Sequence, residues 1–184
     1  MKAYFTASIA GKKQYLSHYT QIIDLLKKRG IEVNADHIIG VSEEQLDSQT
    51  KEQRISFQAK LDQWISSCDF MIAETSYPSI GVGYEISLAL TMQKPVLILY
   101  SGKNPPSLLA HHKDTNFVCE QYTTDTLPAI LDDYLAYIKG SSDTRFTFFI
   151  TPAIAAFLEK VSRKQKLPKS VYLRKLIEAD MQSH

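Results

Sequence analysis

The chain has 184 residues, 44% of them hydrophobic and 22% charged, which suffices for one medium domain with a buried core and a smaller second unit. Its formal net charge of +1 gives no overall attraction to nucleic acid or to an anionic membrane. No apolar run approaches the ~20 residues of a membrane span, and no signal-peptide pattern opens the chain. Two cysteines, Cys68 and Cys119, do not make a disulfide framework. We therefore expect a soluble, cytoplasmic protein.

Short apolar runs alternate with helical patterns along the first 138 residues. The expected strands are 3–7, 31–33, 69–74, 95–100 and 117–119. The expected helices are 15–29, 54–66, 83–93 and 127–138. The first two have an apolar stripe, which in 54–66 holds Phe57, Leu61, Trp64 and Ile65, and the last is amphipathic. The polar stretch between the second strand and the second helix, 34–52, is expected to be a loop with at most one helical turn. This alternation predicts an α/β protein with a doubly wound, flavodoxin- or Rossmann-like parallel sheet.

The last 44 residues differ from the rest in pattern and charge. Residues 141–184 carry eight Lys/Arg against four Asp/Glu, whereas residues 1–140 carry thirteen against sixteen. A Gly-Ser-Ser-Asp linker at 140–143 divides the chain into expected domains at 1–139 and 140–184. Beyond it the pattern predicts a strand over 145–151, a helix from Pro152, a break at 167–170 and a helix over 171–181.

Glu85 is the leading candidate for chemistry. It follows two glycines, Gly81 and Gly83, where backbone can approach a ligand closely. It also lies near the expected start of a helix, whose dipole favours an ionised carboxylate. Such a carboxylate can act as a nucleophile or stabilise a sugar cation. The alternative is that Glu85 only caps its helix or pairs with a lysine.

Other polar residues gather in loops expected at the same edge of the sheet. Ser79 could offer its hydroxyl and nearby amides to a phosphate or sugar, or could be an ordinary turn serine. Ser8 and Gly11 follow the first strand and could cradle an anion, although this spacing alone is a weak signal. From its position in the first strand alone, Tyr4 is expected to be a core residue. His37 either lines this edge of the sheet or has a structural role.

Metal and cofactor motifs are not found in the sequence. The five histidines lack metal-ligand spacing, and His111-His112 has no neighbouring cysteine or carboxylate. No Gly-x-Gly-x-x-Gly follows the first strand, and no Walker loop is present. We predict no metal and no cofactor.

Several motifs occur in an order that is more specific than any one of them. They are Tyr4-Phe5-x-x-Ser8-Ile9-x-Gly11, Ala35-Asp36-His37, Trp64-Ile65-x-x-Cys68-Asp69, Ala73-Glu74, Pro78-Ser79-Ile80-Gly81-Val82-Gly83-Tyr84-Glu85 and Lys94-Pro95-Val96. Over about residues 1–138 the chain resembles the 2′-deoxynucleoside 5′-phosphate N-hydrolases of the nucleoside 2-deoxyribosyltransferase superfamily. The resemblance implies a doubly wound α/β fold, a homodimer and cleavage of the N-glycosidic bond of deoxynucleoside monophosphates.

The resemblance also implies roles for individual residues. Glu85 would be the nucleophile that attacks the anomeric carbon, and Tyr4 would position or polarise it. Ser107 would reach the phosphate across the dimer, although the spacing before it differs by about two residues. The residues expected to bind substrate are Ser8, Ile9, Gly11, His37, Ser79, Gly81, Gly83 and Ser107.

Two positions depart from the family pattern. The arginine that the family uses for phosphate is Ala10 here, although Lys12 or Lys13 could replace it in part. The family's catalytic aspartate is Leu61, with Asp62 next to it. Since one residue is ~100° of helical rotation, Asp62 would act in catalysis only after a register change. The remaining alternatives are a different substrate or a degenerate site in a binding protein.

The C-terminal pattern of strand, helix, loop and helix resembles a ribbon-helix-helix module. Such a unit is too small for its own core, and the resemblance implies intertwined dimerisation. One strand face, with Phe146, Phe148 and Ile150, would enter the shared core. The other, with Arg145, Thr147 and Phe149, would face DNA in DNA-binding members.

The sequence thus predicts a homo-oligomeric N-glycosidase-like enzyme that acts on a nucleoside or nucleotide. The alternative is a non-catalytic nucleotide-binding regulator whose tail binds DNA. Under both hypotheses we expect the protein to form oligomers through its C-terminal segment, residues 140–184.

Overall fold

The computed structural model describes residues 1–102, 106, 116–140, 150–165 and 167–183. The chain divides into two compact units, Met1–Gln121 and Tyr122–His184, and each is described by itself. The sequence-based boundary at 139/140 lies within the second of these units.

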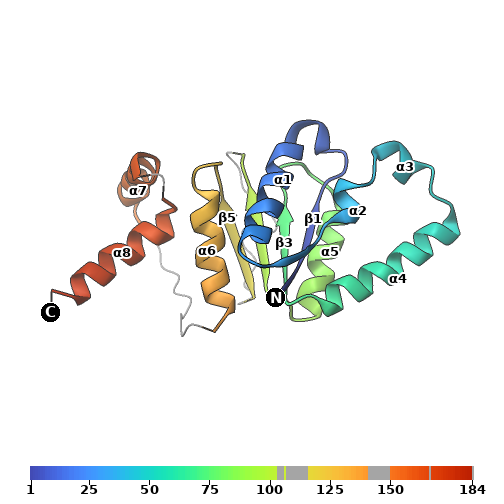
Figure 1. Cartoon of the computed structure of the whole chain (residues 1–184). Coiled ribbons are helices and arrows are strands. Elements are labelled where there is room, and N and C mark those ends of the chain that lie inside the picture. The colour runs from blue at the N-terminus through green and yellow to red at the C-terminus, as the bar shows by residue number, and fades with distance from the viewer. Residues whose placement is uncertain (103–105, 107–115, 141–149, 166, 184) are drawn as a thin grey trace. The chain divides into compact units, whose positions relative to one another are not determined.

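The first unit contains a five-stranded sheet in which every strand runs parallel to its neighbours (Figure 1). Its strands are β1 (Lys2–Ala7), β2 (Glu32–Asn34), β3 (Phe70–Glu74), β4 (Val96–Tyr100) and β5 (Phe117–Gln121). They lie in the order β2-β1-β3-β4-β5, which is the order of doubly wound, flavodoxin-like sheets. The predicted fold class is confirmed.

Helices cover both faces of this sheet (Figure 1). On one face α1 (Lys12–Lys28) packs Tyr19 against Phe5 of β1, with ring centroids 6.0 Å apart. On the other face α4 (Lys51–Ser67) and α5 (Ile80–Thr91) form a core with alternate residues of the strands. Tyr4 belongs to that second core, because successive side chains of a strand point to opposite faces.

The stretch between β2 and α4 differs from the predicted loop. It contains two short helices, α2 (Asp36–Ile39) and α3 (Glu43–Asp47), and α4 starts three residues before its expected beginning. Two reciprocal capping boxes fix these starts, Ser42 with Gln45 and Thr50 with Gln53. Each box satisfies amide groups that would otherwise lack partners at a helix N-terminus, so polar sequence becomes helical here.

Helix α5 also begins earlier than predicted. Ser79 is its N-cap and accepts a hydrogen bond from the Val82 amide (3.4 Å), so Gly81 and Gly83 lie inside the helix rather than in a loop. Glu85 is consequently in the second turn. Since the dipole effect falls off within the first turn, hydrogen bonds and burial, rather than the helix terminus, govern this carboxylate.

Gly11 occupies a closely packed position. A Cβ at this position would lie 2.6 Å from Tyr19 Oη and 2.7 Å from Tyr77 Cβ. We expect Gly11→Ala to lower the free energy of unfolding by about 1–3 kcal/mol, because overpacking forces its neighbours to move. Chemical denaturation measures this loss.

Gly83→Ala is the matched control, because a Cβ there meets no atom within 4 Å. Alanine also favours a helix interior, so this variant is expected to be as stable as the original or slightly more stable. Equal stabilities of the Gly11→Ala variant and the unmodified protein would contradict the packing explanation.

The second unit contains three described helices, α6 (Leu127–Ile138), α7 (Pro152–Gln165) and α8 (Lys169–Met181). The helices predicted after Pro152 and over 171–181 are thus present. Of the strand predicted over 145–151, residues 145–149 lie outside the described part, and with them Arg145, Phe146, Thr147, Phe148 and Phe149.

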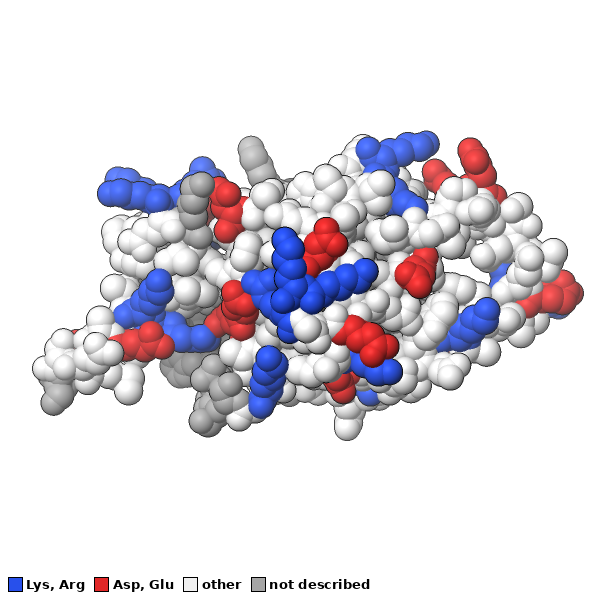
Figure 2. Space-filling view, in the orientation of Figure 1, with Lys and Arg blue, Asp and Glu red and all other residues white. Residues whose placement is uncertain are grey.

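Several basic residues of the second unit are paired with acids. Glu159 binds Arg163 at 3.0 Å and Lys169 at 2.6 Å, and Arg174 pairs with Asp133. On the face shown in Figure 2, side chains of both signs are interspersed. In the residues that are described, no helix is both long and apolar enough to cross a bilayer.

Candidate active site

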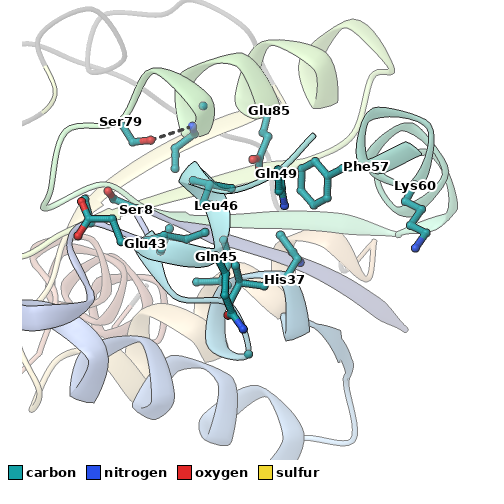
Figure 3. A pocket seen from close by; sticks show the side chains of 18 of the residues that line it. Ser8, His37, Glu43, Gln45, Leu46, Gln49, Phe57, Lys60, Ser79 and Glu85 are labelled. Carbon is teal, nitrogen blue, oxygen red and sulfur yellow. Dashed lines mark hydrogen bonds between the residues drawn. The ribbon is translucent and has the colours of Figure 1, made fainter. Parts of the chain in front are cut away.

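A pocket of about 950 Å³ lies where the chain leaves β1 and β3 at the edge of the sheet (Figure 3). After β1 the chain turns to α1 on one face, and after β3 it turns to α5 on the other. Such a switch in direction opens a crevice at the carboxyl ends of parallel strands. The pocket's volume is typical of small-molecule sites.

Glu85 is one of the residues that line this pocket. Its side chain comes from α5, only 8% of the residue is exposed, and Oε2 accepts a hydrogen bond from Tyr4 Oη at 3.1 Å. Burial raises the pKa of Glu85, and the hydroxyl groups of Thr6 and Tyr4 oppose that rise. The result is a carboxylate that is held in one position and poorly solvated, which suits a nucleophile.

Tyr4 connects Glu85 to His37. Tyr4 Oη lies 2.8 Å from His37 Nε2, and the two rings stack with centroids 4.9 Å apart. Burial, and then the neighbouring Glu85, raises the pKa of Tyr4 far above its usual range, so the phenol keeps its proton. Since that proton is donated to Glu85, Nε2 of His37 must donate to Tyr4 Oη.

The lowered pKa of His37 makes the ring neutral near pH 7, and the bond to Tyr4 then puts its proton on Nε2. Burial lowers the pKa of His37 to about 4, and the imidazole is also stacked on Trp64 with centroids 5.2 Å apart. Its other nitrogen, Nδ1, carries a lone pair. That atom is buried and has no hydrogen-bond partner among the described residues, yet the ring lines the pocket. Within the described part of the chain, Nδ1 is thus an unpaired acceptor in a ring that lines the pocket.

Most of the predicted binding residues lie together. Those that line the pocket are Ser8, Ile9, His37, Ser79, Gly81 and Glu85. Tyr4 is fully buried and reaches the site only through its hydroxyl. Gly11 and Gly83 are not among the lining residues, and Ser107 lies outside the described residues.

Asp62 is not brought to the pocket. Its carboxylate lies on the exposed side of α4, where Oδ1 accepts a hydrogen bond from Gln58 Nε2 at 3.1 Å. Gln58 Nε2 also binds Tyr84 Oη at 3.0 Å. Leu61, which occupies the family's aspartate position, is 3% exposed and belongs to the core. The helix therefore keeps the register that leaves Asp62 outside the lining of the pocket.

The two lysines considered as phosphate ligands already have partners. Lys12 Nζ donates to the carbonyl oxygens of Ile39 at 2.9 Å and Val41 at 2.8 Å. It thereby ties the start of α1 to the end of α2 and to the segment that follows it. Lys13 Nζ lies 3.8 Å from a carboxylate oxygen of Glu43, a residue at the pocket wall.

Some pocket residues were missed by the sequence analysis. Phe57 and Trp64 were assigned to an apolar helix stripe, and the wall that α3 contributes, with Gln45 and Leu46, was assigned to a loop. The Ser-x-x-Gln and Thr-x-x-Gln capping patterns at Ser42 and Thr50 could have revealed these helices. In the part of the chain with described coordinates, no three His, Cys, Asp or Glu side chains form a metal-binding group.

A family model described as nucleoside 2-deoxyribosyltransferase matches residues 3–127, the part of the chain that holds this pocket. The chain belongs to the nucleoside 2-deoxyribosyltransferase family. The family resemblance drawn from the sequence is confirmed, and the protein is an enzyme of that kind.

Relatives within the family share most of the chain. The 5-hydroxymethyl-dUMP N-hydrolase of Esox lucius is 32% identical over 148 residues, which are 77% of this chain and 99% of the relative. The structure of the CMP N-glycosidase of Clostridium botulinum aligns with a TM-score of 0.54 at 22% identity, over 73% of this chain and 99% of its own. A 2-deoxyribosyltransferase from Bacillus psychrosaccharolyticus aligns with a TM-score of 0.50 at 18% identity, over 67% and 86%. These two structures share the fold.

Proposed function

We propose that the protein cleaves the N-glycosidic bond of a nucleoside or its 5′-monophosphate, with Glu85 as the nucleophile. The observation that carries the proposal is the hydrogen-bonded chain from His37 through Tyr4 to Glu85, at the wall of a pocket in a nucleoside 2-deoxyribosyltransferase family member. The names of its relatives, an N-hydrolase and an N-glycosidase among them, support the same reaction class.

The reaction follows from the position of the carboxylate. Glu85 attacks the anomeric carbon, and the bond from that carbon to the base nitrogen breaks. The electron pair leaves with the base, which takes up a proton. Water then hydrolyses the glycosyl ester and restores the carboxylate. The products are the free base and the sugar or sugar phosphate.

The residues that line the pocket support the proposal for each part of the substrate. Phe57, Trp64 and His37 offer aromatic surface, with Phe57 and Trp64 edge-to-face at 6.0 Å, which suits a planar base. The lone pair of His37 Nδ1 can accept a hydrogen bond from the base or sugar. The hydroxyls of Ser8 and Ser79 and the glycine backbone at Gly81 suit the sugar end.

A panel of deoxynucleosides and deoxynucleotides, followed by chromatography for free base, tests the proposal. We expect release of the free base from at least one of them. Binding of several panel members without release of base from any would contradict it. That outcome would leave nucleotide binding without hydrolysis, which is the alternative drawn from the sequence.

We also propose that the protein is a homo-oligomer held together by its C-terminal helices. Helix α8 has no buried residue and α7 has one, Leu158. Large apolar side chains on both helices are exposed, namely Ile154, Phe157, Leu176, Ile177 and Met181. Pairing with a second copy would cover this surface.

Deletion of residues 141–184 is therefore expected to lower the oligomeric state, measured as mass by light scattering. Phe157→Ser combined with Ile177→Ser in the full chain is the point-variant equivalent, because these side chains are 54% and 60% exposed. An unchanged mass in both would contradict tail-mediated assembly. DNA binding by the tail would instead appear as an affinity that falls steeply with salt.

A further inference from the structure

Two segments that are far apart in the sequence form part of the pocket wall. The loop after β1 contributes Ser8, Ile9 and Ala10, and the stretch that runs from α2 through α3 contributes His37 and several residues after it. Figure 3 shows Ser8 of the first segment and His37 of the second around the same pocket. The shape of the pocket therefore depends on contacts that hold these two segments together.

The second segment has little to hold it in place by itself. Helix α2 has only four residues, which is too few for a stable helix without outside contacts. The last carbonyl groups of a helix also have no amide donor within it. His37 and Ile38 are buried, but none of the described side chains from Gly40 to Thr50 is. The position of this segment is therefore sensitive to its polar contacts.

Lys12 supplies two such contacts. Its Nζ donates to the carbonyl oxygens of Ile39 at 2.9 Å and Val41 at 2.8 Å, on either side of Gly40, the residue that ends α2. Hydrogen bonds from a charged donor are stronger than those between neutral groups. The start of α1 is itself firmly placed, because Gly11 next to Lys12 is closely packed. One side chain thus joins α2 to a fixed part of the first unit.

We propose that Lys12 is a positioning residue for the reaction: it holds the end of α2 so that His37 stays hydrogen-bonded to Tyr4, which in turn binds Glu85. The inference rests on the proposed N-glycosidase function. His37 lies two residues before Ile39 in the same short helix, so release of the Ile39 carbonyl lets the imidazole move. Lys12 acts through His37 and does not bind the substrate.

Lys12→Met tests this role, because it removes the ammonium group and keeps most of the side chain's length. We expect kcat/KM to fall by about tenfold or more for every panel member that releases base, with or without a 5′-phosphate, since a small displacement near the reacting atoms costs up to about 10² in rate. Lys12→Arg keeps donors for both carbonyls and is expected to retain most of the rate. A loss confined to monophosphates would identify Lys12 as a phosphate ligand and overturn the inference.

Lys94→Met is the matched control. Lys94 Nζ also donates to two main-chain carbonyls at a helix C-terminus, those of Ser66 at 2.7 Å and Cys68 at 2.8 Å, at the end of α4. Lys94 is not among the described residues that line the pocket. We expect this variant to unfold at a lower temperature with kcat/KM changed less than about twofold. Equal losses of rate in the Lys94→Met and Lys12→Met variants would mean that stability alone is at work, and would overturn the inference.

The imidazole of His37 gives a readout that does not need catalysis. Its ring packs against Tyr4 of β1 and against Phe57 and Trp64 of α4, none of which is charged near pH 7. Burial lowers its pKa to about 4, and Asp36 of its own helix acts in the opposite direction. The pKa therefore reports whether the ring remains buried.

NMR of the imidazole nitrogens as a function of pH measures this pKa, with the His37 signals assigned by their loss in His37→Gln. In Lys12→Met we expect the pKa to rise toward its ordinary value of about 6.5, whereas in Lys94→Met it should stay low. Lys12→Gln, which can donate to one carbonyl, allows the same comparison if Lys12→Met does not fold.

The two measurements also separate this inference from the proposed function. If no substrate releases base, the N-glycosidase proposal fails, but the titration of His37 still tests the role of Lys12. A folded Lys12→Met or Lys12→Gln variant in which the pKa of His37 is unchanged would overturn the inference.

Discussion

Replacement of Glu85 by glutamine is expected to lower base release by at least about 10³-fold, because the amide cannot attack the anomeric carbon. The substitution preserves size, and glutamine Oε1 can still accept the hydrogen bond from Tyr4. Substrate binding is therefore expected to remain. Initial rates with a substrate found in the panel, together with calorimetric binding, measure the two effects separately.

Thermal unfolding serves as the control for Glu85→Gln. The raised pKa means that the folded state favours the protonated carboxyl, so ionisation of Glu85 costs stability as pH rises above its unfolded value. The neutral amide removes that cost. Near pH 7 the variant should unfold at the same or a higher temperature than the wild type, and any advantage should shrink at acid pH. A variant that is stable and retains the full rate would refute the assignment of Glu85 as nucleophile.

Replacement of Tyr4 by phenylalanine is expected to lower kcat by about 10- to 100-fold, since one hydrogen bond to a charged group is lost. The loss should also change the dependence on pH. Tyr4 donates to the ionised carboxylate and so lowers its pKa against the effect of burial. Without this donor the pKa of Glu85 rises further, and the acid limb of the rate profile should move to higher pH.

A purely structural role for Tyr4 predicts a different result. The hydroxyl would then affect stability and rate at every pH without moving the acid limb. Tyr19→Phe is a matched control, because its hydroxyl is also buried but binds the Ser8 carbonyl at 3.2 Å rather than Glu85. An acid limb that stays in place in Tyr4→Phe, or that moves equally in Tyr19→Phe, would count against the proposed coupling.

The sheet could be predicted from the sequence because its central strands, β1, β3 and β4, are short, apolar and buried on both faces. Residues 70–74 carry no alternation of polar and apolar residues, which is typical of a central parallel strand. The region between β2 and α4 could not be predicted by periodicity, because α2 and α3 have four and five residues and are too short for a recurring apolar stripe. Hydrogen bonds at the capping residues, rather than an apolar stripe, determine where helices begin in this region.

The site was predictable in part for a similar reason. Glu85 and Tyr4 were proposed together through the family resemblance, but the hydrogen bond between Tyr4 and His37 joins residues 33 apart and follows only from the pairing of β1 with β2. The orientation of Asp62 depends on how α4 rotates on the sheet. Leu61 and Ile65 fix that rotation by entering the core, and no local pattern of polar residues reveals it.

The hydrogen bond from Tyr4 to Glu85 spans 81 positions of the chain and exists only when β1 and β3 lie side by side. Such long-range closure comes late in folding, since loop entropy must be lost before the contacts form. Enzyme activity should therefore disappear at the same denaturant concentration as the β1–β3 pairing, which makes turnover a sensitive reporter of native topology.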